Sequence, residues 1–203
     1  MKKIRVLLLV LVLLCLCGCS FKKENVKLFD DEEAKKYAEK SFGKCSLVNS
    51  DRTQSDSVKF IFVDEQYKFT YTVTSEIEEV KFPKTFYHSR EISDFDEIYY
   101  DYILNSLSGE ISRIQNEKGV KILKREKVYL KNIYAYDKNL FDIYNDNDDI
   151  EKMKVASNEL IKSIKKIDTR NFYKGYYIYL YSTLDEDDMG DKKVLERIPL
   201  EKK

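Results

Sequence analysis

The stretch SVKFIFVDEQYKFTYTVTS, residues 57–75, decides the fold because it carries the clearest strand pattern in the chain. Apolar and polar residues alternate along it, the apolar ones being Tyr67, Phe69, Tyr71 and Val73. A period of two predicts a strand with one buried face. The polar residues Asp64, Glu65 and Gln66 interrupt the run, so we predict a hairpin here.

The segment before this hairpin has the period of a helix. Asp30 followed by Glu33 is a capping-box arrangement, which is typical of a helix start. Apolar and small residues then recur at three- and four-residue spacing up to Gly43, namely Ala34, Tyr37, Ala38, Ser41 and Phe42. We predict a short amphipathic helix between Asp30 and Gly43.

Two longer helices are predicted further along. From Ser93 to Gly119 one stripe consists of Phe95, Tyr99, Tyr102, Ile103, Leu107, Ile111 and Ile114. A second stripe follows the cluster NDNDD, residues 145–149, and consists of Ile150, Met153, Leu160, Ile161, Ile164 and Ile167. Acidic groups offset the positive end of a helix dipole, so this cluster reads as a helix start.

The remaining segments have strand character. Residues 120–144 contain the β-type runs VKIL, KVYLKNIYAY and LFDIY, whose edges the sequence does not fix. The end of the chain predicts another hairpin, residues 175–182 and 193–199, around an acidic turn.

Strands and helices therefore occur in blocks, without the alternation typical of a parallel sheet. We predict an α+β fold, with one antiparallel sheet built from hairpins and about three helices packed mainly on one face. With only two prolines and six glycines there is little room for an interdomain hinge, so residues 30–203 are expected to form a single domain.

The chain opens with a charged segment and a hydrophobic core. Lys2, Lys3 and Arg5 precede an uninterrupted apolar run from Val6 to Leu16. Eleven apolar positions match a signal-peptide core, whereas a spanning helix needs about 20. Residues 1–18 are thus expected to be a signal peptide; an uncleaved anchor is the alternative.

The end of this run, Leu16-Cys17-Gly18-Cys19, resembles the lipobox of bacterial lipoproteins. The resemblance covers only the first twenty residues. It implies that the Cys19 thiol forms a thioether with diacylglycerol, that a signal peptidase cuts before Cys19, and that the new amino terminus can take a further acyl chain such as palmitate. Cys17 departs from the usual small residue, and cleavage before Cys17 would place the large Leu16 at the cut.

The resemblance implies a protein held at the cell membrane, on its extracytoplasmic face, by membrane lipid on Cys19. Residues 19–29 would then be a lipidated tether. Removing the signal peptide leaves 33 basic residues against 36 acidic ones, or about three negative charges. No basic surplus remains for nucleic acid, so nucleic acid is not an expected partner.

Metal and disulfide chemistry have few candidate residues. A zinc site needs four converging ligands, yet outside the signal peptide the chain offers only Cys19, Cys45 and His88 as thiol or imidazole ligands. Cys19 and Cys45 do not make a disulfide framework. We therefore expect no metal site and no cofactor, and a buried, unpartnered Cys45.

Catalytic residues are equally scarce. His88 is the only histidine and is predicted to lie in a loop beside Ser89, Arg90 and Glu91, where adjacent side chains rarely converge. Paired carboxylates could hydrolyse glycosides without histidine, but the chain has no Trp to grip a sugar. No residue is assigned a catalytic role.

One acidic stretch matches part of a calcium loop. In DEDDMGDKKVLE, Asp185, Asp187, Gly190 and Glu196 fall at positions 1, 3, 6 and 12. Met189 occupies the fifth position, where an oxygen ligand belongs, and the preceding run is β-like rather than helical. A solvated hairpin turn is the favoured interpretation of residues 185–196, and calcium binding is the alternative.

Alternating tyrosines give the one candidate binding surface. Tyr177, Tyr179 and Tyr181 lie two residues apart, with Tyr176 beside them. On a central strand this places aromatic rings on both faces, and an exposed row would suit an interface. If helices cover both faces, the same rings are core residues.

The leading functional hypothesis is a non-enzymatic binding module at the outer face of the cytoplasmic membrane, with a protein or envelope component as partner. The alternative is an envelope glycoside hydrolase that uses paired carboxylates. Such enzymes hold their two carboxyl groups about 5 to 9 Å apart. A transporter receptor is a third hypothesis, which the short chain disfavours.

Overall fold

The computed structural model describes residues 23–81, 85–124, 138–182 and 194–201. These form two compact units, divided between Asp94 and Phe95, and each unit has its own four-stranded sheet. The predicted α+β class is confirmed. The prediction of one domain over residues 30–203 concerns folding as a unit and stays a prediction. Cys19 and the signal peptide lie outside the described residues.

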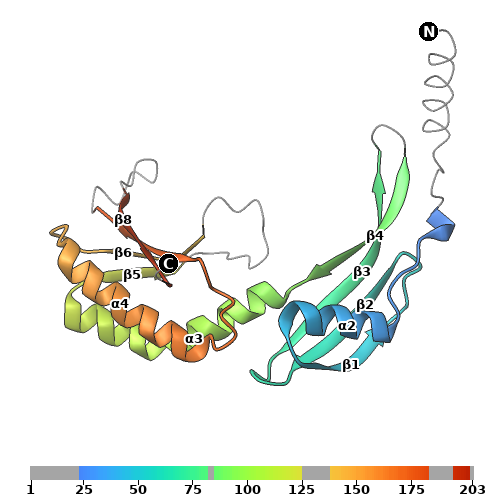
Figure 1. The fold of residues 1–203 in the computed structure, drawn as a ribbon, viewed down its shortest axis with the longest axis horizontal. Helices are drawn as coiled ribbons and strands as arrows, with labels where there is room; N and C mark the ends of the chain where they lie inside the picture. Colours follow the sequence, from blue (N-terminus) through green and yellow to red (C-terminus); the bar gives the residue numbers. More distant parts are fainter. Residues whose placement is uncertain (1–22, 82–84, 125–137, 183–193, 202–203) are drawn as a thin grey trace, which may run out of the picture. The chain divides into compact units, whose positions relative to one another are not determined.

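The first unit is an antiparallel sheet with one helix against it (Figure 1). We call this sheet A; its strand order is β1-β2-β3-β4. Its elements are the 3-10 helix η1 (Lys23–Asn25), α2 (Asp31–Phe42), β1 (Cys45–Asp51), β2 (Ser57–Asp64), β3 (Thr70–Val80) and β4 (Phe86–Ser93). The predicted helix and the predicted 57–75 hairpin are both confirmed by α2, β2 and β3.

Local chemistry sets the bounds of α2. The Glu33 backbone N–H donates to the Asp30 carboxylate at 2.9 Å, and the Asp30 N–H donates to the Glu33 carboxylate at 3.0 Å. This capping box satisfies two N–H groups that a helix start leaves open. The helix ends at Gly43, whose φ of 102° suits a residue without Cβ.

One face of sheet A packs under α2. Ala34, Ala38 and Phe42 of the helix are buried, and the Phe42 ring lies 5.5 Å from that of Tyr71 on β3. Phe60 and Phe62 on β2 are fully buried on the same side. Residues 23–29, which the sequence assigned to the tether, also contact this unit, since the Phe29 N–H donates to the Ser75 hydroxyl at 3.3 Å.

The second unit is built on sheet B, with strand order β5-β6-β7-β8. The predicted stripes after Ser93 and after NDNDD form its two helices, and the predicted terminal hairpin forms β7 and β8. Its elements are α3 (Phe95–Lys118), β5 (Lys121–Lys124), β6 (Asn139–Tyr144), α4 (Ile150–Ile167), β7 (Tyr177–Tyr181) and β8 (Val194–Pro199).

Two features of the sheets differ from the sequence-based expectation. The strands form two sheets rather than one, and β6 pairs with β7 in parallel. Parallel neighbours need a long crossover, usually a helix, and α4 is the element that joins β6 to β7. The other strand pairs are antiparallel as predicted.

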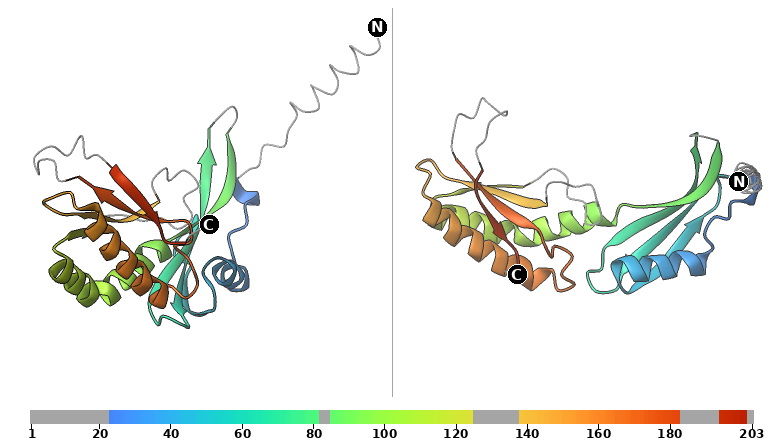
Figure 2. Two further views of the ribbon diagram at one scale, coloured as in Figure 1. Left: turned by 60° about the vertical axis from the view of Figure 1, so that its left-hand side comes forward. Right: turned by 45° about the horizontal axis from the view of Figure 1, so that its top comes forward.

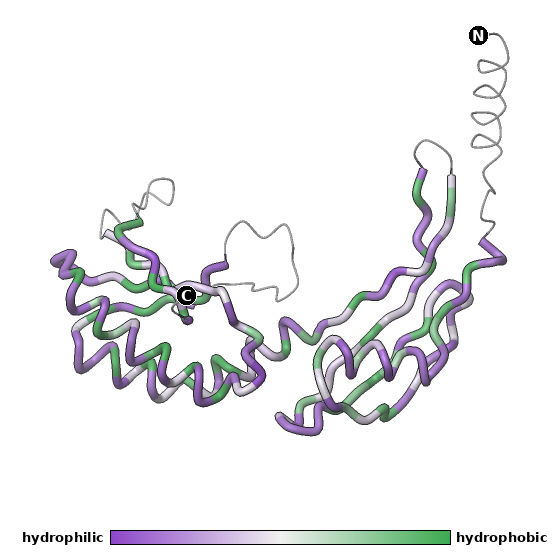
Figure 3. The backbone as a smooth tube through the Cα atoms, viewed as in Figure 1, coloured by the Kyte–Doolittle hydropathy of each residue, from purple (hydrophilic) through white to green (hydrophobic). Residues whose placement is uncertain are grey.

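Both long helices lie on the same side of sheet B (Figure 2). Hydrophilic and hydrophobic residues alternate along α3 and α4, as Figure 3 shows. The apolar residues of each helix are buried, among them Ile103, Leu107, Leu160 and Ile164. None of the described helices is long and apolar enough to cross a membrane.

Candidate functional site

Sheet B has one face against the helices and one face turned away from them. Glu196 on β8 pairs with Leu180 in register and receives Lys154 of α4 at 3.0 Å. The face that carries Leu180 is therefore the helix-covered face, and Ile178 and Leu180 are fully buried in it. Because side chains alternate along a strand, Tyr177, Tyr179 and Tyr181 lie on the opposite face.

The register extends this opposite face across three further strands. Asp142 of β6 lies beside Tyr179, and Leu123 of β5 lies beside Asp142. Tyr144 and Lys121 pair on the same face, with the ammonium 5.5 Å from the ring centre. We call this the aromatic face, and define it by Lys121, Leu123, Asp142, Tyr144, Tyr177, Tyr179, Tyr181 and Arg197.

The rings of this face are in mutual contact. Tyr177 and Tyr179 have centroids 6.5 Å apart, and Tyr179 and Tyr181 have centroids 6.1 Å apart. The Arg197 guanidinium lies 4.9 Å over the Tyr179 ring, a distance suited to a cation–π interaction. Tyr179 is therefore contacted by a tyrosine on each side along β7 and by Arg197 from the neighbouring strand β8.

Exposure on the aromatic face increases away from its centre. Tyr179 is buried, with 6% of its surface exposed, whereas Tyr177 and Tyr181 are partly exposed. Leu123 is 41% exposed and adds apolar area to this face. Tyr176, the other tyrosine of the sequence motif, is buried outside this row, and its burial raises its pKa to about 12. Among the described residues, the ends of the aromatic row are thus more accessible than its centre.

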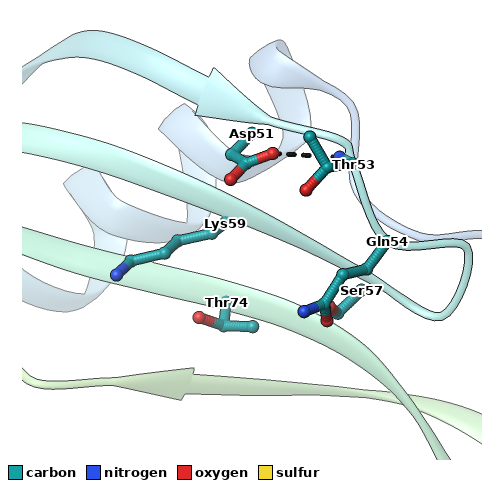
Figure 4. A pocket seen from close by; sticks show the side chains of 6 residues that line it. All are labelled: Asp51, Thr53, Gln54, Ser57, Lys59 and Thr74. Carbon is teal, nitrogen blue, oxygen red and sulfur yellow. Dashed lines mark hydrogen bonds between the residues drawn. The ribbon is translucent and has the colours of Figure 1, made fainter.

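A polar cavity lies on sheet A (Figure 4). It has a volume of about 170 Å³ and is lined by Asp51, Thr53, Gln54, Ser57, Lys59 and Thr74. The Thr53 N–H donates to the Asp51 carboxylate at 2.9 Å, and this hydrogen bond lowers the pKa of Asp51. The lining holds one carboxylate, whereas hydrolysis of a glycoside by paired carboxylates needs two.

His88 lies in strand β4 and not in the predicted loop. Its Nε2 is 3.4 Å from the Glu78 carboxylate, which also accepts a hydrogen bond from Arg90 at 3.3 Å. Because side chains alternate along β4, Ser89 and Glu91 lie on the opposite face from His88. The structure therefore separates the residues that a local triad would need.

The thiol and metal candidates do not converge. Cys45 is buried in the first unit, and burial raises the pKa of its thiol. Among the described residues, no group of three or more His, Cys, Asp or Glu side chains is placed to hold a metal ion. Of the calcium-loop candidates, only Glu196 is described, and it is in strand β8 bound to Lys154; Asp185, Asp187 and Gly190 lie outside the described ranges.

Comparison with known proteins gives no relative. No protein-family model, no curated protein and no solved structure matches the chain. Its function is therefore inferred from its residues and their geometry.

Sequence reasoning identified the tyrosines of the candidate surface but missed its charged members. Arg197 and Asp142 flank Tyr179 on neighbouring strands, at positions that only the strand register defines. A period of two is visible in YYIYLY, but the identity of the neighbouring strand is not.

Proposed function

We propose that the protein is a lipid-anchored, non-enzymatic interaction module at the outer face of the cytoplasmic membrane, and that it binds a protein or envelope partner through the aromatic face of sheet B. The observation that carries the binding proposal is the distribution of the helices. Among the described elements, α3 and α4 lie on one side of sheet B, and the tyrosine row lies on the other.

The composition of the aromatic face suits a binding surface. Tyrosine provides a large contact area with little side-chain entropy to lose, and aromatic residues and arginine are enriched at the centres of protein interfaces. The Tyr179 ring is already packed under Arg197, so the pair is preorganised and a partner would not need to order it. The partly exposed Tyr177 and Tyr181 then supply contact area on each side.

The anchor is supported by the lipobox-like residues at Cys19. Burial of acyl chains stabilises membrane attachment by about 0.8 kcal/mol per methylene, so one chain holds marginally and two or more hold stably. A diacylglyceryl thioether on Cys19 would keep the mature protein on the membrane.

The anchor is tested with Cys19→Ala. We expect this variant to lose labelling by radioactive palmitate and to accumulate as uncleaved precursor, because the modified thiol precedes cleavage. Normal processing and labelling of the variant would remove the anchor from the proposal.

The binding surface is tested by site-specific photo-crosslinking of the lipidated protein in its native membrane. A photoreactive residue in place of Tyr177 or Tyr181 should give an adduct of one defined mass. The matched control is the same residue in place of Val48, a strand position of the first unit that is 62% exposed. Equal adducts from position 48, or none from positions 177 and 181, would argue against this surface.

A further inference from the structure

The hairpin of β3 and β4 extends past the rest of sheet A (Figure 1). Strand β2 pairs with β3 only from Thr70 to Glu76, and the last pair is Ser57 with Glu76. Residues Ile77–Val80 of β3 pair with Phe86–Ser89 of β4 alone. At about 3.3 Å per residue, the hairpin reaches roughly 13 Å beyond β2.

The outer end of this hairpin carries apolar side chains. Val80 and Phe86 form the last cross-strand pair, and Phe86 is 39% exposed. Exposed Lys81 follows directly after Val80, and Tyr87 follows Phe86. We call Val80, Lys81, Phe86 and Tyr87 the hairpin tip.

The nearest acidic side chain on the Phe86 face, Glu78, already has basic partners. Glu78 contacts both His88 and Arg90. On the opposite face, exposed Glu79 pairs in register with Tyr87. The hairpin tip itself consists of apolar and aromatic side chains and one lysine. Side chains of this kind, with aromatic rings next to lysine, are favoured at the boundary between headgroups and acyl chains.

The chain that leaves the proposed anchor is held beside this hairpin. Lys23 of η1 forms an ion pair with Asp56 at 2.5 Å, and the Asp56 carbonyl accepts the Ile77 N–H at 2.8 Å, at the base of the extension. A cavity of about 360 Å³ is lined by Asn25 and Val26 next to η1 and by Phe86, Tyr87 and His88 of β4. All residues that line this cavity belong to the first unit.

The distance from Cys19 to this contact is short. Three residues lie between Cys19 and Lys23, and the four Cα–Cα steps from one to the other span at most about 14 Å when fully extended. With a lipid on Cys19, the bilayer surface therefore lies within about 14 Å of Lys23. This distance is similar to the length of the hairpin extension.

We propose that the hairpin tip inserts into the phospholipid surface next to the lipid anchor and forms a second membrane contact. This inference rests on the proposed lipidation of Cys19. The short tether gives the tip a high effective concentration at the surface, so a small apolar group suffices. Because the mature chain has no basic surplus, the insertion is apolar and does not depend on anionic lipid.

The chain contains no tryptophan, so one introduced tryptophan reports on its own position. Phe86→Trp keeps an aromatic side chain at the tip. Val48→Trp, on β1 of the same unit, is the matched control at an exposed strand position. The lipidated full-length protein is reconstituted into vesicles of brominated phosphatidylcholine, with unbrominated vesicles for reference.

Burial about 5–10 Å into the interface predicts about twofold quenching and a blue shift for Phe86→Trp, with little change for Val48→Trp. Similar values at both positions in lipidated protein would overturn the hairpin contact. Quenching that required anionic lipid would overturn the apolar mode of insertion. Mass spectrometry of the same samples separates the two proposals, because protein without acyl chains contradicts the anchor whatever the fluorescence shows.

Discussion

Tyr173 is a fully packed side chain whose hydroxyl group finds no hydrogen-bond partner among the described residues. Its ring contacts Tyr99 at 5.6 Å and Tyr176 at 5.5 Å. Burial raises the pKa of Tyr173 well above its ordinary value. A buried hydroxyl without a partner costs stability, because it gave up hydrogen bonds with water.

We expect Tyr173→Phe to raise the free energy of unfolding by about 1 kcal/mol near neutral pH, since only the unpaired hydroxyl is lost. The raised pKa adds a pH dependence. Unfolded tyrosine ionises near pH 10, about its ordinary pKa, so the wild type has its full stability below that pH and loses stability as the pH rises further. Tyr173→Phe should lose less stability than the wild type over the same alkaline range.

The measurement is urea unfolding at neutral pH and at two alkaline values. Tyr87→Phe, at a partly exposed position of the first unit, is the matched control and should change stability by less than about 0.5 kcal/mol. A clear loss of stability in Tyr173→Phe at neutral pH would mean that the hydroxyl has a partner.

Asp168 shows why the sequence could not predict every structural residue. Its carboxylate accepts hydrogen bonds from the Tyr99 hydroxyl at 2.7 Å and from the backbone N–H groups of Phe172 and Tyr173, each at 2.9 Å. It is one of 36 acidic residues, and two of its three donors are backbone groups. No side-chain pattern in the sequence distinguishes it from an exposed aspartate.

At the scale of elements, Asp168 connects three parts of the second unit. Its backbone N–H caps the last turn of α4 at 2.7 Å from the Ile164 carbonyl, while its carboxylate holds Tyr99 of α3 and the chain that leads to β7. We expect Asp168→Asn to lower the free energy of unfolding by about 1–3 kcal/mol, because an amide nitrogen would face donor groups.

Asp146→Asn is the matched control in the same unit, since the Asp146 side chain is 81% exposed and 3.9 Å from Lys121. Chemical denaturation followed by circular dichroism measures both variants. Equal stability of the two variants would show that the three hydrogen bonds to Asp168 contribute little.

Periodicity predicted the helices and two hairpins because each has one buried face. It failed at β4, where His88 was expected in a loop. The strand lies at the edge of sheet A and its outer part pairs only with β3, so polar and apolar residues occur on both of its faces. The parallel pairing of β6 with β7 was also missed, because periodicity shows that a strand exists and not which strand lies beside it.

The candidate surface was predictable to a similar degree. The tyrosine row of β7 was identified from its spacing, but its orientation away from α3 and α4 required the strand register. Arg197, which is stacked over Tyr179, comes from a strand that is separated from β7 in sequence by the acidic segment 183–193.

At the scale of the whole molecule, one residue separates the last strand of the first unit from the first helix of the second. Asp94 follows β4 and precedes α3. Its carboxylate accepts hydrogen bonds from the Thr72 backbone N–H at 2.6 Å and from the Thr72 hydroxyl at 2.7 Å. Both hydrogen bonds lie within the first unit, at its last residue before α3 begins.

The predicted single domain requires both units to unfold in one transition. Small units bury a low fraction of their surface and are marginal alone, so each unit is expected to depend on the other for stability. Hydrogen exchange in urea, read by mass spectrometry, follows peptides of both units at once. We expect one shared midpoint, and we expect Asp168→Asn to lower it for peptides of sheet A as well as of sheet B. A shift confined to peptides after Phe95 would replace the single domain with two domains.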